Sequence, residues 1–138
     1  MVFLDAQEGT YVEELGGMNM YFVYDDGRIV TPETGTILEG ITRASIIELA
    51  GKLGHPVEER RFGIDEWRED VTSGRITEIF ACGTAAVVTP VGQLKWDGGE
   101  VGAADGEAGP LTLQIRQALV DIQYGRADDT FGWMHRVC

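Results

Sequence analysis

The sequence predicts an α+β fold, with strands and helices sharing a single domain over residues 1–138. Three observations lead to this prediction. Apolar residues recur at helical spacing in separate segments, runs rich in aromatic and β-branched residues are typical of strands, and short turn signals join several of these runs as hairpins do. With 43% hydrophobic residues, the chain has enough apolar side chains to build a core.

The first predicted strand is Asn19–Tyr24, where the sequence NMYFVY is almost entirely aromatic or apolar. The Asp-Asp-Gly sequence at 25–27 is typical of a hairpin turn, and residues 28–30 then predict a second extended run. Residues 31–40, TPETGTILEG, predict a loop because they contain turn-forming residues and no regular apolar pattern.

A helix is predicted after this loop. Its buried face consists of apolar residues three or four positions apart: Ile46, Leu49, Ala50 and Leu53. Gly54 predicts the end of the helix and Pro56 prevents its continuation. Residues 57–62 then predict a strand with an exposed charged face.

The middle of the chain predicts a short helix and three strands. The helix covers residues 65–72, and three apolar side chains in this region face inward: Ile64, Trp67 and Val71. The strands are predicted at 76–81, before an interruption at Gly83, at 86–88 and at 91–96, with Thr89-Pro90 as the break between the last two.

Residues 97–109 are rich in glycine, alanine and acid and predict a mobile surface loop. Pro110 suits the first position of the last helix, and Gly125 is a plausible C-cap. One apolar stripe defines this helix: Leu111, Ile115, Ala118, Leu119 and Ile122. The tail, 129–138, contains Phe-Gly-Trp-Met and is expected to pack back on the domain.

The net charge of −12 argues against binding to nucleic acid or an anionic membrane, because phosphate groups attract a basic surface. The apolar runs are too short for a membrane span, and the N-terminus does not resemble a signal peptide, so a cytoplasmic protein is expected. The two cysteines, Cys82 and Cys138, form no CxxC motif or Cys/His cluster, so we expect no metal site.

Two segments could bind an anion through their backbone. At Gly40-Ile41-Thr42-Arg43, a loop enters a helix, where free N–H groups attract phosphate, although the local pattern alone favours Thr42 as a simple helix cap. At 82–86, CGTAA, small residues between two apolar strands allow a ligand near the backbone, and Thr84 could donate to it. Taken alone, this second segment is better explained as a bulge or a tight corner.

A carboxylate pair, Glu13-Glu14, precedes two glycines and the first strand, and could bind a ring N–H of a cofactor or merely be solvated at a turn. Cys82 is expected to be a small buried thiol rather than a nucleophile. Only two lysines exist, Lys52 and Lys95, so any chemistry that needs a lysine within this chain must use one of them.

The order of these motifs resembles the C-terminal part of the branched-chain amino-acid aminotransferases, which belong to the class IV pyridoxal-phosphate family. Five segments between about residues 3 and 137 carry the resemblance: EELGGMNMYFV, TPETGTILEGITRASIIELA, VEERRFGIDEW, EIFACGTAAVVTPV and IQYGRADDTFGWM. The GITR and GTAA elements are shared with the wider class IV family. The ELGGMN run and the IQYG…GWM ending resemble the branched-chain enzymes in particular.

The resemblance implies cofactor-binding roles for four residues. Glu14 matches the glutamate that pairs with the pyridine nitrogen of pyridoxal 5'-phosphate, with Glu13 as the adjacent alternative. Ile41 and Thr42 match the residues whose backbone N–H groups, with the Thr hydroxyl, bind its phosphate, and Thr84 matches a further phosphate ligand.

For the substrate, Ala85 matches a residue whose backbone helps to bind the carboxylate, and Gly17 matches a position that lines the pocket. The family's Schiff-base lysine lies on a segment that would precede Met1, and neither Lys52 nor Lys95 matches it. We therefore expect no catalytic residue of this kind in the chain. The resemblance implies the C-terminal cofactor-binding domain of such an enzyme, without its N-terminal domain and inactive alone.

The activity implied for the parent enzyme is transfer of the amino group of Leu, Ile or Val to 2-oxoglutarate, in a homodimer. Two alternatives are open. The chain could come from another class IV enzyme, such as a D-amino-acid aminotransferase or an aminodeoxychorismate lyase. It could also be a non-catalytic module that binds anions or a partner protein.

Overall fold

The computed structural model describes residues 1–35, 37–102 and 108–137. It contains both helices and sheets, and it confirms the predicted α+β class. None of the described helices is long and apolar enough to cross a membrane.

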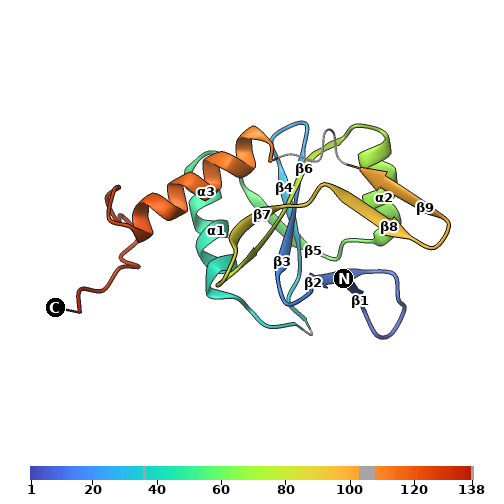
Figure 1. Cartoon of the computed structure of the whole chain (residues 1–138), viewed down its shortest axis with the longest axis horizontal. Coiled ribbons are helices and arrows are strands. Elements are labelled where there is room, and N and C mark those ends of the chain that lie inside the picture. Colours follow the sequence, from blue (N-terminus) through green and yellow to red (C-terminus); the bar gives the residue numbers. More distant parts are fainter. Residues whose placement is uncertain (36, 103–107, 138) are drawn as a thin grey trace.

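A five-stranded sheet forms the centre of the molecule (Figure 1). Its strands, in spatial order, are β5 (Val57–Arg60), β4 (Ile29–Pro32), β3 (Asn19–Tyr24), β6 (Ile76–Gly83) and β7 (Val87–Pro90). Only β4 and β5 are parallel, and the other neighbours are antiparallel. Consequently the C-terminal ends of β4, β5 and β6 lie at one edge of the sheet, together with the N-terminal ends of β3 and β7.

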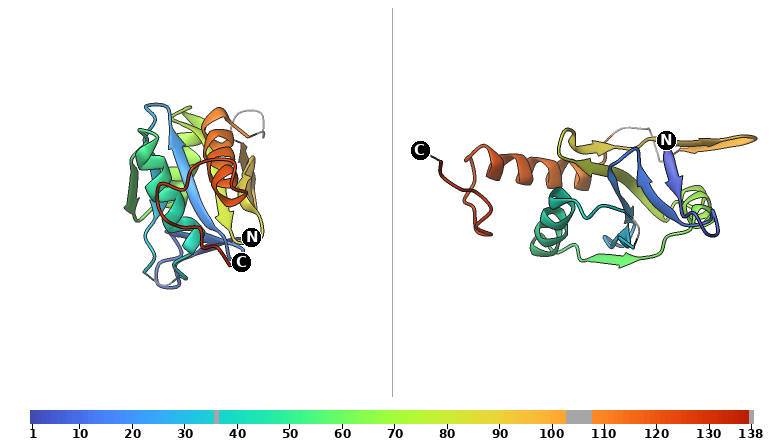
Figure 2. Two further views of the ribbon diagram at one scale, coloured as in Figure 1. Left: turned by 90° about the vertical axis from the view of Figure 1, so that its left-hand side faces the viewer. Right: turned by 90° about the horizontal axis from the view of Figure 1, so that it is seen from below.

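Both faces of this sheet are covered, as the views in Figures 1 and 2 show. The helices α1 (Ile41–Lys52) and α3 (Pro110–Gln123) pack on one face. The opposite face is covered by α2 (Ile64–Thr72) and by two hairpins, β1 (Val2–Leu4) with β2 (Val12–Leu15) and β8 (Gln93–Trp96) with β9 (Gly99–Gly102).

The composition of β3 explains why both faces of the sheet must be covered by other elements. All six of its residues are buried, so it has no polar face to expose to water. Tyr21 points to the α1 and α3 side, where its ring stacks on Phe80 at 4.7 Å between centroids. Phe22 points the other way and stacks on Phe62 at 3.9 Å, with Trp67 edge-on at 5.1 Å.

Most of the predicted elements are confirmed. The strand 19–24 has the predicted bounds, the three helices form, and the predicted apolar stripes of α1 and α3 face the core. Phe131 and Trp133 of the tail pack against the α1 and α3 core, as predicted, with their rings stacked 4.1 Å apart. Cys138 lies outside the described residues.

Three predictions of irregular structure were wrong in part. Thr31 and Pro32, predicted as loop, belong to β4. Thr89 and Pro90, predicted as a break, belong to β7, which is an edge strand and therefore tolerates a proline without a backbone N–H. Within the loop predicted at 97–109, residues 99–102 form β9, and residues 103–107 lie outside the described part of the chain.

The hairpin β1–β2 was not predicted. Its strands are short, with three and four residues, and only Val12 is fully buried. A pattern this short gives too few residues for alternation to be recognised in the sequence.

Candidate functional site

Three segments that are distant in sequence meet at the sheet edge where β4 and β6 end (Figure 1). They are the β2–β3 turn at 15–18, the start of α1 at 40–42 and the β6–β7 turn at 84–86. The strand directions place them there, because β3 starts at the edge where the chain leaves β4 and β6.

Short contacts connect the three segments. Asn19, at the start of β3, is paired with Cys82 near the end of β6. A Cβ atom on Gly40 would lie 2.7 Å from Oδ1 of Asn19, so α1 begins directly against this strand. A Cβ atom on Gly83 would lie 3.2 Å from Cγ of Met18, so the two turns are also in contact. Side chains at either glycine would separate the segments.

The β2–β3 turn requires its two glycines. Leu15 and Met18 exchange two backbone hydrogen bonds of 2.9 Å, and the φ angles of Gly16 and Gly17 are 53° and 86°. Two consecutive positive φ angles define the tight hairpin turn that glycine adopts most easily. Gly17 is exposed with open space around it, and Glu14, half-buried, lies on β2 just before the turn.

The first turn of α1 presents free backbone donors. The N-cap is Gly40, which has no side chain to accept a hydrogen bond, and the first turn contains no acidic residue. Thr42 is the second helical residue, so the prediction that it merely caps the helix was wrong. Ile41 is exposed and Thr42 half-exposed, which leaves their N–H groups at the positive end of the helix dipole.

The start of α3 shows the contrasting arrangement. The buried carboxylate of Glu78 accepts hydrogen bonds from the N–H groups of Leu111, at 3.3 Å, and Thr112, at 2.8 Å. Gly109 makes room for it, since a Cβ there would lie 2.2 Å from the carboxylate. The chain thus supplies its own anion to α3 and leaves the corresponding groups of α1 open.

The β6–β7 turn carries backbone strain beside the exposed residues Thr84 and Ala85. Val87 has a φ of 59° and is the one non-glycine residue with a positive φ among the described residues. This conformation is unfavourable for a β-branched side chain, and such strain is frequent at binding sites.

Cys82 lies directly beneath this turn. It is fully buried, and burial raises the pKa of its thiol to about 11. A thiol that stays protonated at neutral pH is a poor nucleophile, in agreement with the expectation that Cys82 has a packing role.

Neither lysine lies at this edge of the sheet. Lys52 is the last residue of α1, about 15 Å along the helix from Thr42, and it contacts the Thr130 hydroxyl and the ring of Phe131. Lys95 lies on β8, on the other side of the sheet, and pairs with Glu100 at 3.5 Å.

Two cavities adjoin the site. One, of about 180 Å³, lies between the first turn of α1, including Ile41 and Thr42, and the tail residues Trp133 and Met134. Neither Thr84 nor Glu14 lines it.

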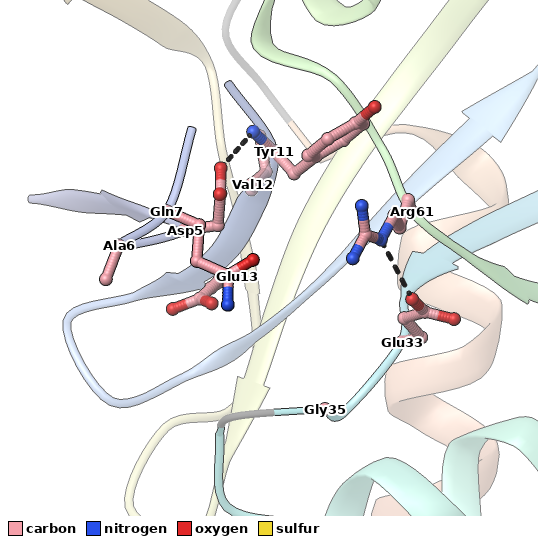
Figure 3. Close-up of a pocket in the computed structure, with 9 residues that line it drawn as sticks. All are labelled: Asp5, Ala6, Gln7, Tyr11, Val12, Glu13, Glu33, Gly35 and Arg61. Carbon is pink, nitrogen blue, oxygen red and sulfur yellow. Dashed lines mark hydrogen bonds and ion pairs between the residues drawn. The ribbon is translucent and has the colours of Figure 1, made fainter. Parts of the chain in front are cut away.

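The other cavity, of about 230 Å³, lies at the ends of β4 and β5 and is shown in Figure 3. Glu13 lines it, whereas Glu14 does not. Arg61 crosses this cavity, with its Nε 3.4 Å from the Glu33 carboxylate and its guanidinium 5.0 Å from the Tyr11 ring centroid. The acidic lining makes this cavity a poor place for an anion.

Comparison with known proteins identifies relatives for the whole chain. Residues 2–94 match the family described as amino-transferase class IV. The chain is 51% identical, over 99% of its length, to the branched-chain-amino-acid aminotransferase of Mycolicibacterium smegmatis, and 50% identical to that of Mycobacterium tuberculosis strain H37Rv. It spans 38% of the length of both relatives.

Solved structures give the same result. The T.th. branched-chain amino acid aminotransferase with pyridoxamine 5'-phosphate is 36% identical, with a TM-score of 0.81 over 99% of this chain and 41% of the other. The Escherichia coli branched-chain amino acid aminotransferase is also 36% identical, with a TM-score of 0.78 over 98% of this chain and 42% of the other. Sequence and fold agree, and the chain belongs to the class IV aminotransferase family.

Proposed function

We propose that this chain forms the cofactor-binding part of a branched-chain amino-acid aminotransferase. The observation that supports it most is the meeting of the α1 start, the β6–β7 turn and the β2–β3 turn at one edge of the sheet, where the matched residues lie. The relatives named above support the choice of branched-chain substrates.

The residues present fit the phosphate of pyridoxal phosphate. The N–H groups of Ile41 and Thr42 have no capping side chain, and a dianion at a helix N-terminus is stabilised by both hydrogen bonds and the dipole. The Thr42 and Thr84 hydroxyls each add a donor, so the phosphate is bound from two elements that Asn19 and Cys82 connect.

Glu14 would pair with the pyridine nitrogen of the cofactor and keep it protonated. Glu14 is a half-buried residue of β2, and the hydrogen-bonded glycine turn that follows Leu15 fixes the end of this strand. Pyridoxal phosphate supplies the electron sink for bond breaking at the substrate Cα, and a protonated ring nitrogen strengthens that sink.

On this proposal Gly17 lines the substrate pocket and Ala85 binds the substrate carboxylate through its backbone. The amino group passes from Leu, Ile or Val to 2-oxoglutarate in a homodimer in the cytoplasm. The lysine that attaches the cofactor and moves the proton lies outside these 138 residues, because Lys52 and Lys95 point elsewhere. The chain alone therefore binds the cofactor weakly and does not turn over.

The proposal is tested by calorimetric titration of the chain with pyridoxal phosphate. Thr42→Ala and Thr84→Ala should each weaken binding about tenfold, because each removes a hydrogen bond to a charged group. Thr72→Ala is the matched control, since its hydroxyl bonds to its own helix at the Arg68 carbonyl, at 2.7 Å, away from the site. Equal affinities for all three variants and the unchanged chain would contradict the proposed site.

A further inference from the structure

Asn19 is the only asparagine of the chain and lies where the three segments meet. Only 8% of its surface is exposed. No hydrogen bond of its side chain is found within the described residues, although its backbone is part of the β3–β6 ladder. The Asn19 carboxamide is not among the fully buried polar groups that lack a partner in the described part of the chain, so this small exposed fraction leaves it accessible to a ligand at the site.

The carboxamide is aimed at the start of α1. Its Oδ1 lies 2.7 Å from where a Cβ of Gly40 would be, and this same point is 3.7 Å from the backbone nitrogen of Arg43. A capping side chain of an N-cap residue extends from that point toward the first helical N–H groups. Asn19 thus lies, from a neighbouring strand, beside the space that a capping side chain on Gly40 would fill, and α1 has no side-chain capping hydrogen bond.

The first turn of α1 is also fixed from its other side. Nη2 of the buried Arg43 donates to the carbonyl of Pro32 at 3.1 Å and to Oε1 of Glu59 at 2.7 Å. The Tyr21 hydroxyl donates to the Arg43 carbonyl at 3.0 Å. Through these bonds of Nη2, Arg43 positions the first turn of α1.

We propose that Asn19 is a further anion-binding residue, which places a carboxamide N–H of Nδ2 on the phosphate group bound by Ile41 and Thr42. This inference rests on the proposed function. A carboxamide suits the position because it is uncharged and carries both a hydrogen-bond acceptor, Oδ1, and a donor group, Nδ2. Oδ1 faces the positive end of α1 while Nδ2 offers two donors to the anion, whereas a carboxylate would offer none.

The test is titration of the chain with inorganic phosphate and with pyridoxal phosphate, together with thermal unfolding without ligand. Asn19→Leu should weaken both affinities about tenfold or more, yet leave the unliganded melting temperature nearly unchanged, because the variant is similar in size and breaks no side-chain hydrogen bond found in the described residues. Asn19→Ser, a smaller change, should weaken binding in the same direction. Asn19→Asp should abolish phosphate binding through charge repulsion.

Thr112→Val is the matched control. Thr112 is also buried, and its hydroxyl has no partner within the described residues, but it lies on α3 beside Glu78. This variant should change the melting temperature without changing either affinity.

The possible results separate the inference from the proposal on which it rests. If Asn19→Ser binds phosphate as tightly as the unchanged chain while Thr42→Ala binds it weakly, the role of Asn19 is wrong and the site stands. If the unchanged chain binds neither ligand, the site and the role of Asn19 both fail.

Discussion

At the scale of single residues, the candidate site places the exposed backbone of the β6–β7 turn next to the buried thiol of Cys82. Cys82 is paired with Asn19 through the backbone, and its side chain is directed into the core beside Tyr21. Burial raises the pKa of both side chains, that of Cys82 to about 11. The thiol therefore remains protonated under conditions in which an ordinary cysteine begins to ionise.

We predict that Cys82 resists alkylation in the folded chain. At pH 8, a pKa of about 11 leaves roughly one thiol in a thousand ionised, and burial blocks the reagent as well. Iodoacetamide treatment followed by peptide mass spectrometry should find Cys82 unmodified in the native protein and modified in denaturant. Fast modification of the native protein would contradict the buried position.

At the scale of elements, the hairpin β1–β2 depends on one carboxylate. Asp5 accepts hydrogen bonds from the N–H groups of Glu8, Thr10 and Tyr11, at 2.7 to 2.9 Å. The bond from Tyr11 contributes most, and together these bonds lower the pKa of Asp5 to about 2. A pKa below the unfolded value means that the ionised form stabilises the folded chain.

Asp5→Asn should therefore destabilise the protein in a pH-dependent way. The contribution of Asp5 is complete above its unfolded pKa, near 4, and is lost as the pH falls through about 2. Thermal unfolding should show a lower melting temperature for the variant at pH 7 and a shrinking difference from pH 4 to pH 2. A constant difference over this range would refute the role of the charge.

The helix α3 depends on Glu78 in a similar way. Replacing Glu78 with Ala removes both hydrogen bonds to the first turn and leaves the N–H groups of Leu111 and Thr112 buried without the carboxylate that they bond. The free energy of unfolding should fall by about 2 kcal/mol or more, measured by urea denaturation. Glu48→Ala, on the exposed side of α1, is the control and should have little effect.

The helices were predictable because their apolar residues recur over two or more turns, as Ile46, Leu49 and Ala50 do. The hairpin β1–β2 and the full length of β7 were not, because three or four residues give no clear period and Pro90 is typical of a break. At the site, the local patterns favoured a helix cap at Thr42 and a bulge or corner at Thr84, and only the family resemblance implied that both bind one phosphate. No sequence pattern indicated that Asn19 lies between them, since only strand pairing places it there.

For the whole molecule, stability depends on a sheet that is buried on both faces. Phe22 lies at the centre of the α2 side, in contact with Phe62 and Trp67. Phe22→Ala should lower the free energy of unfolding by about 3–5 kcal/mol, because it leaves a cavity in a packed core. Denaturant titration measures this loss, and a change below about 1 kcal/mol would contradict the packing described for β3.

The pairing of Asn19 with Cys82 also makes the site depend on the folding of the whole sheet. These residues are far apart in sequence, and the loop between them contains β4, α1, β5 and α2. Closing so long a loop costs chain entropy, so this contact depends on the packing of the whole sheet and is lost when the sheet unfolds. A phosphate bound there is a ligand of the native state alone. Its binding free energy therefore adds to the stability of the whole sheet, and the melting temperature should rise with phosphate concentration.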